Sequence, residues 1–334
     1  MPRLLHSFLA LAVAAASAAA QSASIADTGH ELVLSYGPLT LPARTSHDQM
    51  VELPTLTLKI PADGWLHGID VDIVDAHGRV LPRTLLHHLT AIEPDQRDLF
   101  NPGMMRIGAA GAETGAVTMP WFIGLPVHRG DSVFIRIMLS NATDTAYDHI
   151  TLRARAPFTH AHKFWPVLSI YPLDAAIGPK DKPNVFDLPP GRSEHYWEGT
   201  PAVSGRVLAL MGHLHRYGVL LRFEDRTTHT VLWEARPTRD STGEILSMPM
   251  STFLWRLGKP IDSSHVYRLT AIYDNPTGQT IPDGGMGVLA GVMFLSGHSW
   301  PKIDRTDPAY LNDLRETLQG SQMGEMAHMQ HSTP

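Results

Sequence analysis

Two histidines separated by one residue form the pattern with the clearest chemistry in this chain. His213 and His215 lie in GHLHRYG, and the apolar residues before them predict a β-strand that ends in a turn. Side chains at positions i and i+2 of a strand project from the same face, so both imidazoles can approach one metal ion. Two hydrogen-bonded structural histidines are an equally ordinary explanation of an isolated pair. A third ligand on a neighbouring strand would favour the interpretation as a metal site.

A methionine near the C-terminal end is the candidate for this third ligand. Met286 lies in PDGGMGVLAGVMFL, where a glycine-rich turn enters an apolar strand. Two imidazoles and one thioether form a mixed nitrogen and sulfur set, which suits copper in both oxidation states and suits zinc poorly. Core packing is the alternative, because the flexible methionine side chain commonly fills gaps.

A second histidine pair occurs in the first half of the chain. His87 and His88 are adjacent in RTLLHHLTAIEPDQ. Neighbouring residues of a regular strand point to opposite faces, so these two can share an ion only where the strand ends or bulges. Pro82 and a loop beginning near Glu93 would allow such an irregular end. In a regular strand, one imidazole would point inward and the other into solvent.

The elements that must position these residues are predicted to be β-strands. Apolar and polar residues alternate in many short segments, and turn residues separate these segments. With 27 Gly and 26 Pro, the chain is predicted to be all-β with many short connections. One stretch, residues 307–319, has helical spacing, with Asp307 as its expected N-cap. The clearest alternating segments are residues 55–60, 69–75, 132–140, 149–156 and 266–274.

A chain of 334 residues is too long for one ordinary core and predicts two domains. A run of aromatic residues and proline near residues 156–166 separates two sets of strands. We therefore expect one β-sandwich over residues 25–158 and another over residues 159–303. Residues 304–334 are expected to form the short helix and a flexible tail.

Two further groups of histidines and methionines could bind metal. His160 and His162 form another H-x-H pattern at the predicted domain joint, where polar linker residues are the simpler interpretation. The tail has the Met and His spacing of copper-capturing segments, and it is also consistent with a flexible polar tail. The residues concerned in the tail are Met323, Met326, His328, Met329 and His331.

The N-terminus and the overall composition predict an exported protein. Residues 1–20 have the pattern of a signal peptide, with Arg3 before an apolar stretch and an A-x-A site before Gln21. No later segment reaches the roughly 18 apolar residues of a membrane span, so we expect a secreted or periplasmic protein.

The net charge of −6 and the lack of a basic patch argue against a protein that binds nucleic acid. Without cysteine, a soft metal ligand must come from the 14 methionines.

Four segments in order resemble the copper type II, ascorbate-dependent monooxygenases, the family that includes peptidylglycine α-hydroxylating monooxygenase and dopamine β-monooxygenase. The resemblance extends from about residue 50 to residue 296. The segments are the His87–His88 pair, LPVHRGDSVFIRIMLSNAT (125–143), HLHRYG (213–218) and YDNPTGQTIPDGGMGVLAGVMF (273–294).

This resemblance implies two tandem, jelly-roll-like antiparallel β-sandwiches that each hold one copper ion. It assigns His213, His215 and Met286 to the copper that activates dioxygen, and His87 and His88 to the copper that passes electrons. Dioxygen and ascorbate, or another small reductant, would then hydroxylate a C–H bond of a small or peptide-like substrate. Family residues that bind peptides or amines are not recognisable here, so the substrate stays open. The lack of cysteine differs from the animal members and suggests a bacterial relative.

The third ligand of the electron-transfer copper is where the chain departs from the family. In IRIMLSN, Met138 occupies the position where the family has histidine. Three alternatives stay open: Met138 is itself a ligand, which favours Cu(I), a nearby imidazole such as His128 replaces it, or the first copper is lost. An exported copper-binding or carrier protein without turnover is the corresponding alternative function. A β-sandwich binding module with structural histidines is the third.

Overall fold

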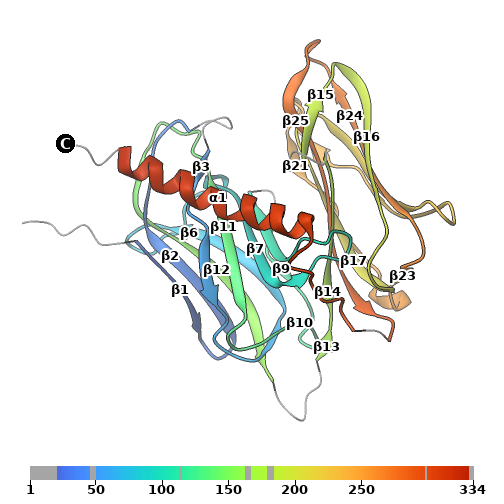
Figure 1. Ribbon diagram of the computed structural model, residues 1–334. Helices are drawn as coiled ribbons and strands as arrows, with labels where there is room; N and C mark the ends of the chain where they lie inside the picture. Colours follow the sequence, from blue (N-terminus) through green and yellow to red (C-terminus); the bar gives the residue numbers. More distant parts are fainter. Residues whose placement is uncertain are drawn as a thin grey trace, which may run out of the picture.

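The all-β class predicted from the sequence is confirmed, because antiparallel sheets dominate the computed structural model (Figure 1). In β11 (Ser132–Leu139) and β17 (Gly205–Leu214), buried and half-buried residues largely alternate, as expected for strands with one face on a core. The expected signal peptide, His162 and His331 lie outside the described residues. The structure describes residues 21–45, 50–112, 115–161, 167–178, 184–297 and 299–330, with side chains up to residue 319.

Two sheets of the described chain enclose the first hydrophobic core. A short 3-10 helix, η2 (Arg83–Leu85), leads into the strand that carries the first histidine pair. The eight-stranded sheet contains β1 (Ser22–Asp27), β2 (Glu31–Leu41), β5 (Gly64–Leu66), β6 (Gly68–Val74), β9 (Val117–Thr118), β10 (Ile123–Val127), β12 (Tyr147–His160) and β13 (Leu168–Ser169). The five-stranded sheet contains β3 (Val51–Glu52), β4 (Leu56–Lys59), β7 (Leu86–Arg97), β8 (Met104–Gly111) and β11.

Two more sheets enclose the second core, and a small ribbon is attached to them. The six-stranded sheet contains β14 (Tyr171–Ile177), β15 (Val185–Leu188), β17, β22 (Ser251–Thr252), β23 (Lys259–Ile261) and β25 (Ile281–Leu295). The four-stranded sheet contains β16 (Gly191–Gly199), β18 (Gly218–Asp225), β19 (Thr230–Ala235) and β24 (Tyr267–Asn275). The ribbon is β20 (Thr238–Arg239) with β21 (Ile245–Ser247), and η3 (Leu254–Arg256) is a 3-10 turn before β23.

The boundary between the two sandwiches lies later than residue 158. β12 continues to His160, and β13 still pairs with β10 of the first sandwich, so the second sandwich begins with β14. The two cores are also linked, because Leu99, Phe100 and Met105 from the first half pack in the second core. The β7–β8 connection therefore inserts into the second sandwich and fixes one domain against the other.

The C-terminal helix is longer than the sequence pattern predicted. α1 spans Pro308–Gln330 and so continues through much of the segment that we expected to be a flexible tail. Residues 320–330 contain no proline, and their Met, Glu, Gln and Ala residues favour a helix enough to offset Gly320 and Gly324. Tyr310 packs with Ile92 and Met104, so α1 covers the outer face of the five-stranded sheet, as Figure 1 shows. Among the described residues, no helix is long and apolar enough to cross a membrane.

Both sandwiches contain the same asparagine-centred turn, a repeat that the sequence pattern did not reveal. Asn141 and Asn275 are buried, and each donates its side-chain amide to backbone carbonyls of neighbouring segments. The threonine two residues later, Thr143 or Thr277, donates its hydroxyl to the asparagine Oδ1. In the second sandwich this turn follows β24 directly and begins the connection to β25.

Candidate metal centre

The structure brings His213, His215 and Met286 together on one face, which we call the metal face. β17 and β25 are antiparallel, with His213 opposite Val288 and Leu214 opposite Gly287. The next residues of the two strands, His215 and Met286, therefore lie side by side at the end of the ladder. Leu214 points into the second core, so the three candidate ligands project from the opposite face. Figure 1 shows β17 on the side of the second sandwich that is turned toward the first.

The spacing of the two imidazoles fits a shared metal ion. The ring centroids of His213 and His215 are 5.4 Å apart, and the rings are nearly perpendicular, at 89°. Two imidazoles that bind one ion through nitrogens about 2.0 Å away have centroids roughly 5 Å apart. Both side chains are half-buried, so they are held by the sheet and still reachable from outside.

A buried tyrosine that the sequence analysis did not single out connects the candidate ligands. The Tyr273 hydroxyl accepts hydrogen bonds from the backbone N–H groups of His215 and Met286, both at 3.0 Å, and donates to the Met286 carbonyl. Burial raises the pKa of Tyr273 well above its usual value, so the hydroxyl keeps its proton. One side chain thus fixes the spacing between the end of β17 and the beginning of the apolar part of β25. In the sequence analysis, Tyr273 appeared only as the first residue of the YDN segment, which gave no indication of its hydrogen bonds.

Replacing Tyr273 with phenylalanine is expected to destabilise the second sandwich by about 2–4 kcal/mol, because two N–H groups and one carbonyl lose their partner in a buried site. Copper affinity should fall about tenfold or more, as for other residues that orient metal ligands. Urea unfolding and copper titration would measure both effects. Tyr36→Phe is the matched control, because its buried hydroxyl has only a long contact, 3.4 Å, with Gln21 in the first sandwich. Equal losses in the two variants would contradict the bridging role.

The first histidine pair meets at a β-bulge. His88 pairs with Met138, whereas the next residue of β11, Leu139, pairs with Leu86, so His87 is the extra residue. The bulge turns both rings toward each other, with 2.8 Å between the two Nδ1 atoms and 4.7 Å between the ring centroids. The irregular strand that a shared ion would require is therefore present. Without an ion, one Nδ1 donates a proton to the other.

The possible third ligands of the first pair differ in their placement. Met138 lies directly opposite His88 in the ladder and is half-buried on the same face. His128 precedes the other end of β11, on the order of 20 Å away along the strand, and its Nδ1 lies 3.4 Å from Asp131. The structure therefore contradicts His128 as the substitute ligand. Among the described residues, no group of three or more His, Asp or Glu side chains could hold a metal ion, so a three-histidine set is not found there.

The remaining described histidine of the H-x-H pattern at the domain joint makes a polar contact. His160 is the last residue of β12, and its Nε2 lies 2.8 Å from the Asp27 carboxylate. It is thus part of the first sandwich rather than of a linker. The carboxylate partner accounts for this side chain without a metal.

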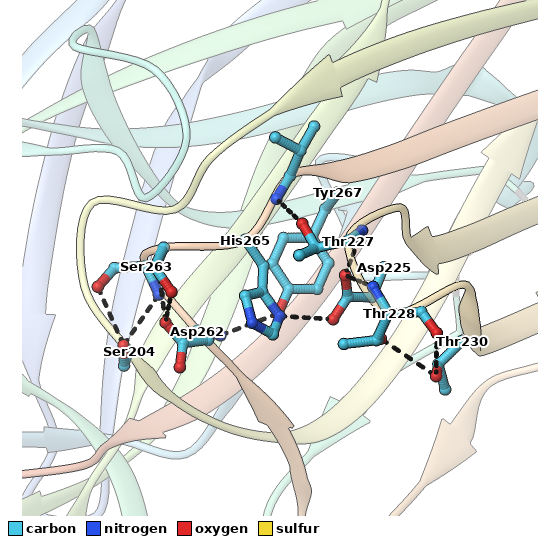
Figure 2. Close-up of polar contacts among 11 residues, drawn as sticks. Ser204, Asp225, Thr227, Thr228, Thr230, Asp262, Ser263, His265 and Tyr267 are labelled. Carbon is cyan, nitrogen blue, oxygen red and sulfur yellow. Dashed lines mark hydrogen bonds and ion pairs between the residues drawn. The ribbon is translucent and has the colours of Figure 1, made fainter.

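A histidine–aspartate pair elsewhere in the second sandwich is structural (Figure 2). His265 Nδ1 lies 2.7 Å from Asp225, and the other oxygen of this carboxylate accepts hydrogen bonds from the backbone of Thr227 and Thr228. Burial opposes ionisation, but the hydrogen bonds from His265 and Thr228 outweigh it and lower the pKa of Asp225. These contacts join the turn after β18 to the turn before β24. They hold the two turns together.

A cluster of one buried and two half-buried carboxyl groups joins the two sandwiches on the same side as the metal face. Arg106 of β8 makes two hydrogen bonds to Asp313 of α1, at 2.8 and 2.7 Å. Asp174 of β14 adds charge to this cluster, and burial raises its pKa. Burial, and then the charge of Asp174, raise the pKa of Asp98 to about 7. Asp174 and Met211 both pair with Ala290, so this joint lies on the same face of the sheet as His213.

No protein-family model matches the chain, and no curated protein matches its sequence.

Proposed function

We propose that this chain is a copper-dependent, monooxygenase-like oxidoreductase that acts after export, in the periplasm or outside the cell. The observation that supports this most is the meeting of His213, His215 and Met286 on the metal face. These residues come from strands that are more than 70 positions apart in the sequence. The backbones of His215 and Met286 meet at the hydroxyl of the buried Tyr273, an arrangement that holds two of the three candidate ligands next to one another.

The donor atoms of the metal face fit copper. Two neutral imidazoles are good ligands for Cu(II), and a thioether keeps Cu(I) accessible, whereas the set suits zinc poorly. Copper bound there would supply the one-electron chemistry with dioxygen that hydroxylation of a C–H bond needs. The chain itself would orient the ligands through Tyr273 and present them on a half-buried face beside the interdomain joint. The substrate in this proposal is a small or peptide-like molecule.

The first histidine pair would supply electrons in this scheme. His87 and His88 present two Nδ1 atoms to one point, and Met138 lies next to them across the ladder. Copper held by this His–His–Met set would accept an electron from ascorbate or another small reductant. It would favour Cu(I) more than a three-histidine set does.

One observation favours a second candidate function, an exported copper carrier without turnover. Both pairs of histidines have a methionine beside them, Met138 in the first sandwich and Met286 in the second. Two sites with a thioether suit storage or transfer of Cu(I), which needs no substrate and no dioxygen.

Copper binding and reoxidation test the proposal together. The chain from Gln21 is loaded with copper, freed of excess ions and measured by mass spectrometry and electron paramagnetic resonance. It is then reduced with ascorbate under argon and exposed to dioxygen. We expect two bound ions and a rapid return of the Cu(II) signal. Bound copper that stays reduced in dioxygen favours the carrier, and a chain that binds no copper rules out both functions.

A further inference from the structure

An exposed apolar surface lies at the end of the molecule where β17 begins. Trp255 is 97% exposed and Leu257 is 74% exposed, and Trp121, at 62%, projects from a loop of the first sandwich. We call the following residues the aromatic edge: Trp121, Phe122, Leu168, Trp255 and Leu257. Figure 1 shows β10 and β13 at the lower end of the first sandwich and β23 at the lower end of the second.

One small core supports the aromatic edge from both sandwiches. Met119 of the first sandwich and Leu254 of the second pack against the same buried cluster, which contains Ile123, Ile170 and Leu208. The two loops that carry the exposed tryptophans are therefore anchored to one another. Trp121 and Phe122 add an edge-to-face contact, with ring centroids 5.7 Å apart.

The turn that carries Trp255 is held in a defined conformation. The N–H of Leu257 donates to the Leu254 carbonyl and the N–H of Gly258 donates to the Phe253 carbonyl, both at 3.0 Å, which closes η3 as in a Schellman motif. The Arg206 guanidinium donates to the carbonyls of Leu257 and Gly258. Trp255 is thus presented to solvent on a preorganised turn rather than on a loose loop.

Leu257 is an unusual residue for its position. Its φ of 53° lies in the left-handed region, where glycine or asparagine ordinarily ends such a turn. The side chain is also largely exposed, so it adds little to the core in return for this backbone strain. A strained residue that exposes apolar surface is better explained by contact with another surface than by folding.

The charges around this turn are cationic, although the whole chain has a net charge of −6. Arg206 hydrogen-bonds to the turn that carries Trp255, Arg256 and Lys259 lie close to Trp255 in the sequence, and residues 245–261 contain no Asp or Glu. Residues 115–130, which include the loop of Trp121, contain none either. The aromatic edge is therefore an apolar surface with a cationic border on an acidic protein.

We propose that the aromatic edge docks on the surface of an anionic lipid bilayer. Tryptophan is enriched at the interface between lipid and water, and basic side chains near it are attracted to anionic headgroups. Trp255 and Leu257 enter the headgroup region, while Arg206 and Arg256 lie at the level of the phosphates. Because β17 begins at this edge and ends at the metal face, roughly 30 Å away, docking leaves the candidate ligands on the aqueous side. The inference does not depend on the proposed function.

Vesicle binding by the chain from Gln21 tests this inference. Sedimentation with vesicles of phosphatidylcholine and phosphatidylglycerol in equal amounts is compared with sedimentation with phosphatidylcholine alone. We expect binding to be about tenfold or more stronger to the anionic vesicles, to weaken with added salt and to shift tryptophan emission to the blue. Equal sedimentation with and without vesicles would overturn the inference.

Matched variants decide whether the aromatic edge is responsible. Trp255→Ala with Leu257→Ala should weaken vesicle binding about tenfold or more, because both apolar side chains are lost from the contact. Val80→Ala with Leu311→Ala removes two other exposed apolar side chains and should bind as the native chain does. Circular dichroism confirms that both variants are folded. An equal loss in the two variants contradicts the inference, as does self-association without vesicles that the Trp255 and Leu257 variant abolishes.

Discussion

Alanine at both His213 and His215 is expected to remove one of two copper ions per chain and to leave the other in place. The two rings are 5.4 Å apart on a half-buried face, so their loss takes away two of three donors without opening a core cavity. Among the described residues, no group of three or more His, Asp or Glu side chains could supply replacement donors at this site. Copper titration monitored by electron paramagnetic resonance would show the loss of one Cu(II) signal.

The matched variant is His87→Ala with His88→Ala, which should remove the other ion. Met286→Leu keeps both imidazoles and should weaken Cu(I) binding much more than Cu(II) binding, because only the thioether is lost. If the double variant at His213 and His215 retains both ions while the protein is folded, these residues are structural and the proposed oxygen-activating site is wrong.

Asp98→Asn is expected to stabilise the protein by about 2–4 kcal/mol at pH 8 and to leave its stability at pH 4 nearly unchanged. Asp98 is buried with a pKa of about 7, above the ordinary aspartate value of about 3.9 that applies in the unfolded chain. The folded state therefore binds the proton more tightly than the unfolded state. Stability is greatest below the unfolded pKa and falls as the pH rises from about 4 to about 7, where Asp98 ionises in the folded protein.

The surroundings of Asp98 make this prediction specific. Asp98 Oδ1 accepts the N–H groups of Phe100 and Asn101, and an asparagine oxygen can keep both bonds. Arg106 faces the cluster and Arg97 lies beside Asp98, while Asp174 and Asp313 are the other carboxyl groups. Because Arg106 directs its hydrogen bonds to Asp313 and to the Met104 carbonyl, a charge on Asp98 is poorly compensated.

Urea unfolding at several pH values would measure the effect at Asp98. Asp240→Asn is a suitable control, because Asp240 is exposed in a turn and its pKa is lowered by hydrogen bonds from Thr242. The control should not gain stability at pH 8. An Asp98→Asn variant with the same pH dependence as the native chain would show that this carboxyl group does not control the stability of the joint.

The local sequence was sufficient for the all-β class, for several of the strands and for the two histidines of the metal face. Alternating polarity predicted the segments that became β11, β12 and β24, because burial on one face leaves a period of two in any strand. The same period places His213 and His215 on one face without any knowledge of their neighbours. The length of α1 was underestimated because the apolar periodicity ends before the helix does.

Only the tertiary structure decided which distant residues meet. The bulge that turns His87 toward His88, and the register that sets Met286 beside His215, depend on pairing between strands far apart in the sequence. No local pattern carries this information. The sequence therefore left both His128 and Met138 as candidate ligands, and the structure shows that they lie at opposite ends of β11. Tyr273 was missed for the same reason, because its role lies in three hydrogen bonds to strands that the sequence does not show to be adjacent. The period of apolar residues determines on which face of a strand a side chain lies, whereas the register and the bulges determine which side chains from different strands meet in a site.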